Sequence, residues 1–435
     1  MKKISGRAFS VLIIAFMVIA GISYFVYKDY NEGGDWAKYF SAYNSSAEGE
    51  IIDTNGYILA YFNGNDMRYA SDAITRTSNY HVTGDYWGRT GSGLIVKYYQ
   101  ASQDFNFFKG STEKISGILQ LSIDSDINNR AYSLLRKNGN GCIMICNYRT
   151  GEVVCMVSSP SIDPDEEIEE GQEIEDGTYL NKCLKATFTP GSTFKLVTTA
   201  AAIEKYPKAL EKTYTCYGET EVAGVTITCT TAHGTQTFTE ALANSCNCAF
   251  ASIAVDIGQE NLLEYASKYG FLDTHEINGI TTAAGNFPKE FVGDPETAWA
   301  GIGQSTDLIC PFSMLRFVSA IANDGELAEM SLVKGDEGEC EKMVETSTAI
   351  KMQQLMKNNV ATHYEGETLF PGLTLGAKTG TAEVGDGTSH SWFTGFLEDE
   401  NHPYAFVALV ENGGYGLWTA GLMMNELLQY ITETN

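Results

Sequence analysis

The segment Ser-Thr-Phe-Lys at residues 192–195 constrains the fold more than any other part of the chain, because an apolar helix is predicted directly after it. A Pro-Gly turn precedes Ser192, and the largely apolar segment at residues 196–203 is typical of a buried helix that begins at this serine. Residues three apart lie on one face of a helix. The hydroxyl of Ser192 and the amine of Lys195 are therefore expected side by side.

This pair has the composition of an activated nucleophile. A serine hydroxyl reacts slowly at neutral pH unless a base lies beside it, and a lysine can be that base when burial or a nearby cation lowers its pKa. The N–H groups at the start of the helix, including that of Ser192, are suited to stabilise an oxyanion. The same Ser-x-x-Lys spacing also occurs at Ser111 and Ser331, so the pattern by itself is weak evidence for catalysis.

Two further motifs strengthen the interpretation. Ser245 and Asn247 form the only Ser-x-Asn in the chain, and residues 378–380 form the only Lys-Thr-Gly. In this order the three motifs resemble the signature set of penicillin-binding proteins and serine β-lactamases. Residues 49–56 further resemble the N-terminal pedestal motif of the class B penicillin-binding proteins, which are peptidoglycan D,D-transpeptidases. The chain resembles specifically the penicillin-binding protein A type with a short pedestal.

The resemblance implies a role for each motif residue. Ser192 is expected to be the nucleophile and Lys195 its base. Ser245 is expected to relay a proton to the leaving amine, and Asn247 to hydrogen-bond the substrate amide. Lys378 is expected to supply positive charge that keeps Lys195 neutral and attracts a carboxylate.

The resemblance also implies that Thr379, Gly380 and Thr381 bind the substrate. Gly380 has no side chain, so a peptide can lie against the strand edge there. The hydroxyls of Thr379 and Thr381 are expected to bind the terminal carboxylate, and the N–H of Thr381 to complete the oxyanion hole with that of Ser192.

The implied reaction is acyl transfer from a D-Ala-D-Ala stem peptide, which cross-links peptidoglycan, with β-lactams acylating the same serine. A D,D-carboxypeptidase or a β-lactamase would keep all three motifs and stays the alternative. A β-lactamase needs a base for deacylation, and no Glu-x-x-Leu-Asn pattern follows Ser245.

The pattern of elements predicts a mixed α/β (α+β) fold. Strand-like runs at residues 142–158 and 376–411 lie at the two ends of the catalytic region, and helical patterns lie between them. The resemblance implies the penicillin-binding transpeptidase or serine β-lactamase-like fold, with an antiparallel sheet flanked by helices, a small N-terminal pedestal and one transmembrane helix.

Three segments are expected along the chain. Residues 1–28 contain the apolar run Phe9–Tyr27 behind basic residues, which predicts a cytoplasmic tail and an uncleaved membrane anchor. Residues 29–120 are expected to form the non-catalytic pedestal, and residues 121–435 the transpeptidase domain. The expected location is the cell membrane, single-pass, with the catalytic domain outside.

Charge limits the partners. The formal net charge of −26 disfavours nucleic acid, which requires a basic surface. The expected partners are stem peptides, β-lactams, the membrane and cell-wall synthesis proteins such as a glycosyltransferase. The acidic run at residues 165–176 is expected to be a solvated loop, and His390 a loop or packing residue and not a base.

The ten cysteines are scattered along the chain. Cys216 and Cys229 bracket a Gly-containing segment, and whether they form a disulfide stays open. A zinc site from these two and His233 lacks a fourth ligand of recognisable spacing, and Cys246 and Cys248 lie too close together for an easy bridge. No metal and no cofactor are therefore expected.

Overall fold

The computed structural model describes residues 13–24, 27, 48–63, 66–95, 105–106, 110–111, 116–169, 171–288, 293–336, 338–385 and 387–434. Contacts divide the chain into two units, one of Met1–Gly49, Tyr61–Arg68 and Tyr99–Gly117, the other of Glu50–Ala60, Tyr69–Tyr98 and Ile118–Asn435. The predicted boundaries after residues 28 and 120 differ from this division and stay a prediction. In the described part of the chain, no helix combines the length and apolarity needed to cross a membrane. The predicted anchor at residues 9–27 falls partly outside that part.

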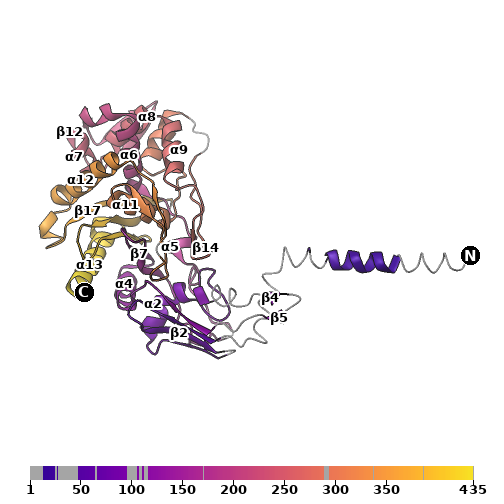
Figure 1. The fold of residues 1–435 in the computed structure, drawn as a ribbon. Helices are drawn as coiled ribbons and strands as arrows, with labels where there is room; N and C mark the ends of the chain where they lie inside the picture. The colour runs from indigo at the N-terminus through magenta and orange to yellow at the C-terminus, as the bar shows by residue number, and fades with distance from the viewer. Residues whose placement is uncertain are drawn as a thin grey trace, which may run out of the picture. The chain divides into compact units, whose positions relative to one another are not determined.

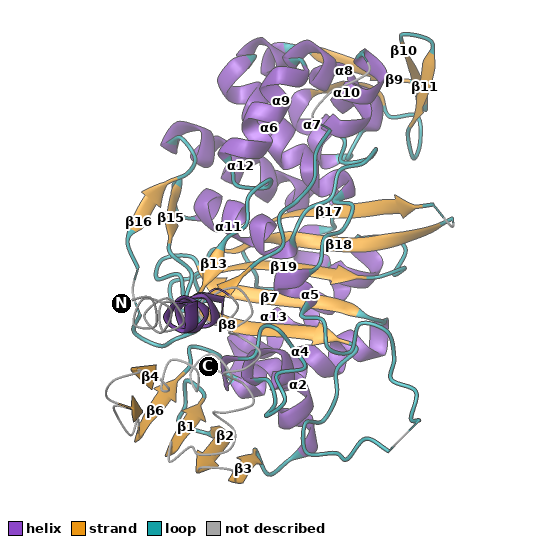
Figure 2. Cartoon of the chain, turned by 90° about the vertical axis from the view of Figure 1, so that its right-hand side faces the viewer, coloured by secondary structure: helices purple, strands orange, loops and turns teal. Residues whose placement is uncertain are grey.

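A five-stranded antiparallel sheet lies at the centre of the larger unit (Figure 2). Its order is β17 (Leu375–Val384), β18 (Thr388–Leu397), β19 (Tyr404–Val410), β7 (Gly141–Asn147) and β8 (Val153–Ser159). The predicted antiparallel sheet, built from two parts of the chain that are distant in sequence, is confirmed. Strand β17 lies at one edge, so it carries the Lys-Thr-Gly motif along an edge of the sheet.

Helices cover both faces of this sheet. Helices α4 (Ser125–Asn138) and α13 (Leu422–Thr434) pack with the strands in one large apolar core. Helices α5 (Lys182–Lys185) and α11 (Pro311–Ala322) contact the strands elsewhere, α11 across three of them. Because both faces are covered, β7 and β19 are apolar and buried along almost their whole length and do not alternate between apolar and polar residues.

Other helices form a lobe next to β17 (Figure 1). They are α6 (Lys195–Lys205), α7 (Phe238–Ala243), α8 (Asn247–Ile257), α9 (Gln259–Lys268), α10 (Asp294–Gly301) and α12 (Thr346–His363). Helix α12 packs against β17, α6 and α7. It thereby joins the strand that carries one motif to the helix that begins with Lys195 of the first motif and to the helix that precedes the Ser-x-Asn motif.

Several short strands and one further helix lie outside the central sheet and its helices. In the lobe, β9 (Thr213–Cys216) pairs with β12 (Gly234–Thr237), and β10 (Glu219–Val222) pairs with β11 (Val225–Thr228). The N-terminal part contains the four-stranded sheet of β3 (Asp66–Tyr69), β2 (Ile58–Asn63), β1 (Glu48–Ile52) and β6 (Ser116–Gln120), helix α2 (Ala73–Thr83), and the pair β4 (Phe105–Asn106) and β5 (Gly110–Ser111). The remaining pairs are β13 (Glu276–Ile277) with β14 (Ile280–Thr281), and β15 (Glu326–Ala328) with β16 (Cys340–Lys342).

Candidate active site

The serine and lysine of the first motif lie together at the start of α6. The predicted helix begins differently: residues Gly191–Phe194 form a 3-10 turn (η1), and α6 itself begins at Lys195. Side chains three apart are almost eclipsed in a 3-10 turn, which has three residues per turn. Lys195 Nζ donates a hydrogen bond of 3.0 Å to Ser192 Oγ, as the spacing predicted.

The second motif lies in the turn between α7 and α8. Ser245 has a φ of 53°, in the left-handed region that side chains other than glycine seldom adopt. This turn places the carbonyl oxygen of Ser245 at 2.6 Å from Lys195 Nζ. Asn247, the first residue of α8, places its Oδ1 at 2.7 Å from the same nitrogen. The Ser-x-Asn motif therefore holds the amine beside the nucleophile.

The third motif reaches the same point from β17. Lys378 Nζ donates to Ser245 Oγ at 2.9 Å, and Lys195 Nζ lies 3.3 Å from the same oxygen. The Ser245 hydroxyl thus lies between two amines. Among the residues that the structure describes, the hydrogen-bond partners of Lys195 and Lys378 are hydroxyls, carbonyls and an amide oxygen, with no carboxylate.

Both lysines are fully buried. Burial lowers the pKa of Lys195 to about 8, against a weaker opposing effect of nearby cysteine thiolates. Burial also lowers the pKa of Lys378 well below its usual value, and the neighbouring Lys195 lowers it further. Two ammonium groups that share one hydroxyl disfavour each other, so we expect the pair to lose a proton readily near neutral pH.

Gly380 is required for the approach of β17 to the nucleophile turn. A Cβ at this position would lie 2.9 Å from Thr193 Cγ2 and 3.0 Å from the carbonyl oxygen of Pro190. Cβ atoms are essentially never found closer than 3.0 Å to such a neighbour, so a side chain here would force one of these groups to move. The glycine of the motif therefore lets the edge strand pack directly against the turn that carries Ser192.

The threonines of β17 already have partners. Tyr364 OH accepts a hydrogen bond from Thr379 N at 3.1 Å and lies 3.1 Å from Thr379 Oγ1, and Thr381 Oγ1 accepts from Gly416 N at 3.2 Å. Tyr364 is buried, and burial raises its pKa to about 12, so its hydroxyl stays protonated. Tyr364 could not be predicted from the sequence, because nothing in the chain marks a tyrosine just after α12 as a neighbour of the motif.

A second loop supports the nucleophile turn. Gly191 N donates to Gly303 O at 2.9 Å, and Gly303 has a φ of 77°. Gly303 is followed by Gln304 and Ser305 in this loop. Ser305 also has a φ of 77°, so it adopts a glycine-like conformation despite its side chain.

The remaining residues that the sequence singled out are His390 and the cysteines. The His390 ring contacts the Phe188 ring at 5.7 Å between centroids and accepts from Asn412 N at 3.2 Å, which agrees with the predicted packing role. The cysteines of the described chain are all free. Cys216 and Cys229 are therefore not bridged in this structure, although both lie in a cluster next to the Ser-x-Asn turn.

The chain is similar in sequence to known proteins. A family model, the penicillin-binding protein transpeptidase domain, matches residues 141–429. The stage V sporulation protein D of Bacillus subtilis is 31% identical over 280 residues, which cover 60% of this chain but only 41% of that protein. The peptidoglycan D,D-transpeptidase PbpA of Mycolicibacterium smegmatis is 26% identical over 358 residues, or 73% of this chain and 71% of that protein.

A solved structure shows the same fold. Penicillin-binding protein A from M. tuberculosis, determined as a ceftriaxone acyl-enzyme complex, superposes with a TM-score of 0.73 at 22% identity. The match covers 88% of this chain and 98% of that one. The predicted fold is confirmed at this level, as an antiparallel five-stranded sheet flanked by helices with an additional N-terminal region.

Proposed function

Because this chain belongs to the penicillin-binding protein transpeptidase family, we propose that Ser192 attacks the amide between the last two D-alanines of a peptidoglycan stem peptide. The predicted family, the predicted activity of a serine D,D-transpeptidase and the predicted status as a β-lactam target are confirmed by the match. The roles of the individual residues are our proposal. The observation that carries it is the 3.0 Å contact between Lys195 Nζ and Ser192 Oγ, made by a lysine with a lowered pKa.

The first half of the reaction forms the acyl-enzyme. Neutral Lys195 takes the proton of Ser192 as Oγ bonds to the carbonyl carbon, and the N–H groups of Ser192 and Thr381 stabilise the oxyanion. The tetrahedral intermediate then breaks its C–N bond. The proton passes from Lys195 through the Ser245 hydroxyl to the leaving amine, so D-alanine departs neutral at its amine and an ester remains on Ser192.

The second half transfers the acyl group. The amine of a neighbouring stem peptide attacks the ester carbonyl and forms the cross-linking amide. The amine's proton returns to Ser192 Oγ through the same two groups, which regenerates the enzyme. Ser245 suits this relay, because its hydroxyl lies within 3.3 Å of both lysine nitrogens.

The edge strand is suited to hold the peptide. Strand β17 is the first strand in the sheet order and pairs within the sheet with β18 alone, so its outer edge can pair with an extended peptide. Thr379 and Thr381 lie on this strand beside the nucleophile turn. We therefore propose that they bind the terminal carboxylate, with Asn247 donating to the substrate amide.

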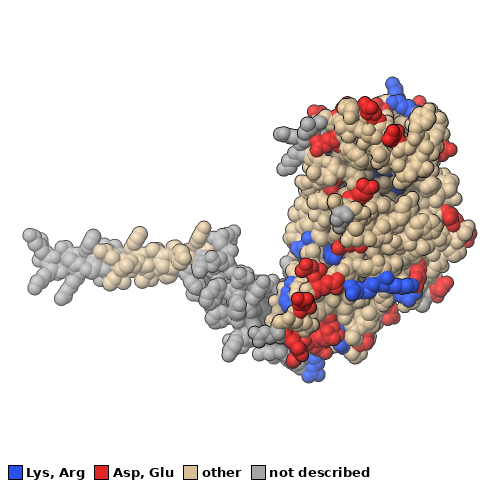
Figure 3. Space-filling view, turned by 180° about the vertical axis from the view of Figure 1, so that it is seen from behind, with Lys and Arg blue, Asp and Glu red and all other residues tan. Residues whose placement is uncertain are grey.

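Local charge is needed to attract that carboxylate. The chain carries a net charge of −26, and Figure 3 shows acidic side chains scattered over the face that it displays. A carboxylate approaching such a surface gains nothing from the overall field. With Lys195 neutral as the base, the buried amine of Lys378 is the positive group that the described site offers.

The alternative hydrolase functions are less well supported. Efficient deacylation requires a base that activates water, and in the described chain no carboxylate bonds to the lysines of the site. This favours an acyl-enzyme that waits for an amine over one that hydrolyses quickly.

The sequence also supports a proposal for the position in the cell. The apolar run at residues 9–27 supports a single-pass membrane anchor with the catalytic domain outside the cell membrane. Residues 29–120 are proposed as a pedestal that contacts cell-wall synthesis partners such as a glycosyltransferase.

Acylation is expected to accelerate as the pH rises. The base form of Lys195 is the reactive one, and its pKa is about 8. Below that pH the reactive fraction should increase about tenfold per pH unit, and the rate should level off above it. Second-order acylation rate constants measured with a fluorescent penicillin between pH 6 and pH 9 would check this. A rate that falls with rising pH would contradict the role of Lys195 as base.

The proposed function is tested with the full-length chain in detergent. We expect one fluorescent penicillin per chain, on the peptide that contains Ser192 by mass spectrometry, with slow release of the label. Incubation with a D-Ala-D-Ala peptide and an amine acceptor should give a transfer product as well as free D-alanine. Rapid release of the label would indicate a β-lactamase, hydrolysis without transfer would indicate a carboxypeptidase, and label on another residue would overturn the assignment of Ser192.

A further inference from the structure

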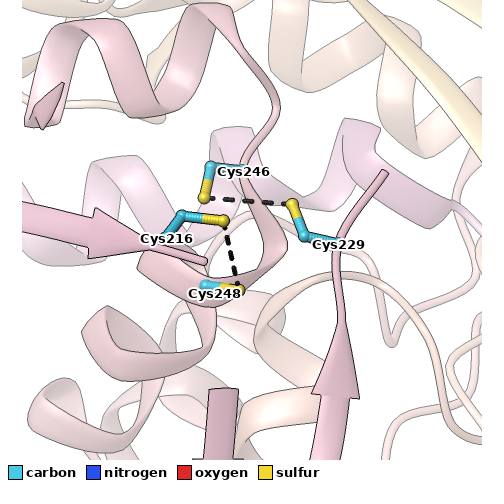
Figure 4. A group of neighbouring side chains, drawn as sticks. All are labelled: Cys216, Cys229, Cys246 and Cys248. Atoms are coloured by element: carbon cyan, nitrogen blue, oxygen red, sulfur yellow. Dashed lines mark hydrogen bonds between the residues drawn. The ribbon is translucent and has the colours of Figure 1, made fainter. Parts of the chain in front are cut away.

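Four cysteines from distant parts of the chain meet beside the Ser-x-Asn turn (Figure 4). Cys216 ends strand β9, and Cys229 directly follows strand β11. Cys246 and Cys248 lie at the start of α8, on either side of Asn247. In Figure 4 all four sulfur atoms point toward a common centre. None of the four has a part in the acyl-transfer steps described above.

The distances between the sulfur atoms match a tetrahedral metal site. The Sγ atoms of all four residues lie within 4.8 Å of one another, with 3.4 Å between Cys216 and Cys248 and 3.9 Å between Cys229 and Cys246. A tetrahedral zinc with Zn–S bonds of about 2.3 Å separates its sulfur ligands by about 3.8 Å. A small inward movement of the side chains would place one ion at the centre.

Burial supports a closed site of the structural kind. Cys216, Cys246 and Cys248 are 1%, 0% and 4% exposed, and Cys229 is partly buried. Four thiolates without an open position for water are typical of structural zinc, whereas catalytic zinc sites keep one position free. Soft sulfur ligands in this geometry favour zinc or iron over magnesium or calcium.

The surroundings of Cys229 are those of a metal-bound thiolate. Its sulfur accepts a hydrogen bond from Asn247 N at 3.2 Å and lies 3.5 Å from Nδ1 of His233. Such contacts to ligand atoms orient them and tune the metal. His233, which the sequence suggested as a ligand, thus lies at the periphery of the cluster, and Cys246 and Cys248 are the further sulfur atoms that the spacing did not reveal.

Two disulfides are the competing arrangement. Each would need its two sulfur atoms about 2.0 Å apart, and it would place no requirement on the distance between the two bridges. In the structure all four sulfurs are mutually close, and no pair is bonded. The convergence of all four on one point is explained by a shared ion.

We propose that Cys216, Cys229, Cys246 and Cys248 bind one zinc ion through four thiolates. This departs from the expectation of no metal that the sequence alone supported. The ion would tie β9 and the end of β11 to the turn that carries Ser245 and Asn247. Asn247 Nδ2 already donates to Thr228 O at 2.9 Å, so the metal would lock a segment that directly contacts the active site.

The first test is metal content. Full-length protein purified in detergent, with a mild reductant and without chelators, should contain about one zinc per chain by elemental mass spectrometry. Cobalt(II) substitution should give the intense visible absorption of tetrahedral cobalt with thiolate ligands. Both measurements use the parent protein, so they do not depend on the folding of a variant or on acyl transfer.

Variants identify the ligands. Cys216→Ser lies outside the Ser-x-Asn turn and should lower the zinc content at least about tenfold, with a lower unfolding temperature and slower acylation. Cys340→Ser, at an exposed cysteine on β16, is the matched control and should keep the parental zinc content and acylation rate.

Three results would overturn the proposal. The first is a pair of disulfides among the four cysteines, found by peptide mapping of the parent protein. The second is alkylation of all four of these thiols in protein that takes up neither zinc nor cobalt. The third is iron in place of zinc. Stoichiometric zinc in a protein that fails to react with penicillin would support the metal site and count against the proposed function alone.

Discussion

Replacing Lys195 by methionine is expected to lower the rate constant for acylation by a β-lactam about 10²- to 10⁴-fold, the usual contribution of a positioned general base. Methionine keeps the length and flexibility of the side chain but cannot accept the proton of Ser192. The substitution also removes a buried amine, whose charged form burial disfavours, so the fold should survive. The acyl-enzyme should still form on Ser192, only slowly.

The measurement is stopped-flow acylation by a fluorescent penicillin, with the unfolding temperature as a check on the fold. Lys205→Met, at the other end of the same helix, is the matched control. Lys205 is exposed and paired with Glu264 at 3.0 Å, a surface ion pair worth about 0–1 kcal/mol. Acylation by Lys195→Met within threefold of the parent rate would show that another group removes the proton.

The local chemistry of the site could be predicted from short motifs. Ser192 and Lys195 are neighbours because of their spacing in a single turn, and this contact is determined by nearby sequence. The strands of the central sheet could be predicted for a similar reason, because runs such as residues 142–146 and 404–410 are continuously apolar. That the motifs meet at all came from the family resemblance and not from any local pattern.

The supporting contacts could not be predicted, because they join residues far apart in the chain. Cys216 and Cys248 are 32 residues apart and approach only after β9 packs on α8. Tyr364 reaches Thr379 because α12 lies along β17. Neither approach leaves a periodic or spaced signal in the sequence, so only the packed structure reveals the cysteine cluster and the tyrosine.

Alanine at Gly303 is expected to damage both stability and activity. A Cβ there would lie 2.0 Å from the carbonyl oxygen of Gly191 and 2.8 Å from Phe194 Cβ, so the turn that carries Ser192 must move. The positive φ of 77° adds strain of its own. We expect a loss of about 2–4 kcal/mol in the free energy of unfolding. A displacement of the nucleophile by about 1 Å should slow acylation about 10²-fold.

A second glycine separates the effect of the steric clash from the effect of the backbone strain. Gly279, in the turn between β13 and β14, has a φ of 75°, and an added Cβ there would meet nothing within 4 Å. Gly279→Ala should therefore cost only the backbone strain of about 1–2 kcal/mol and leave acylation unchanged. Urea unfolding and acylation kinetics on both variants give the comparison. If Gly303→Ala were no more destabilised than Gly279→Ala and acylated at the parental rate, the nucleophile turn would not depend on this contact. If only the acylation rate of Gly303→Ala fell, the loop would act by positioning Ser192 and not by stabilising the fold.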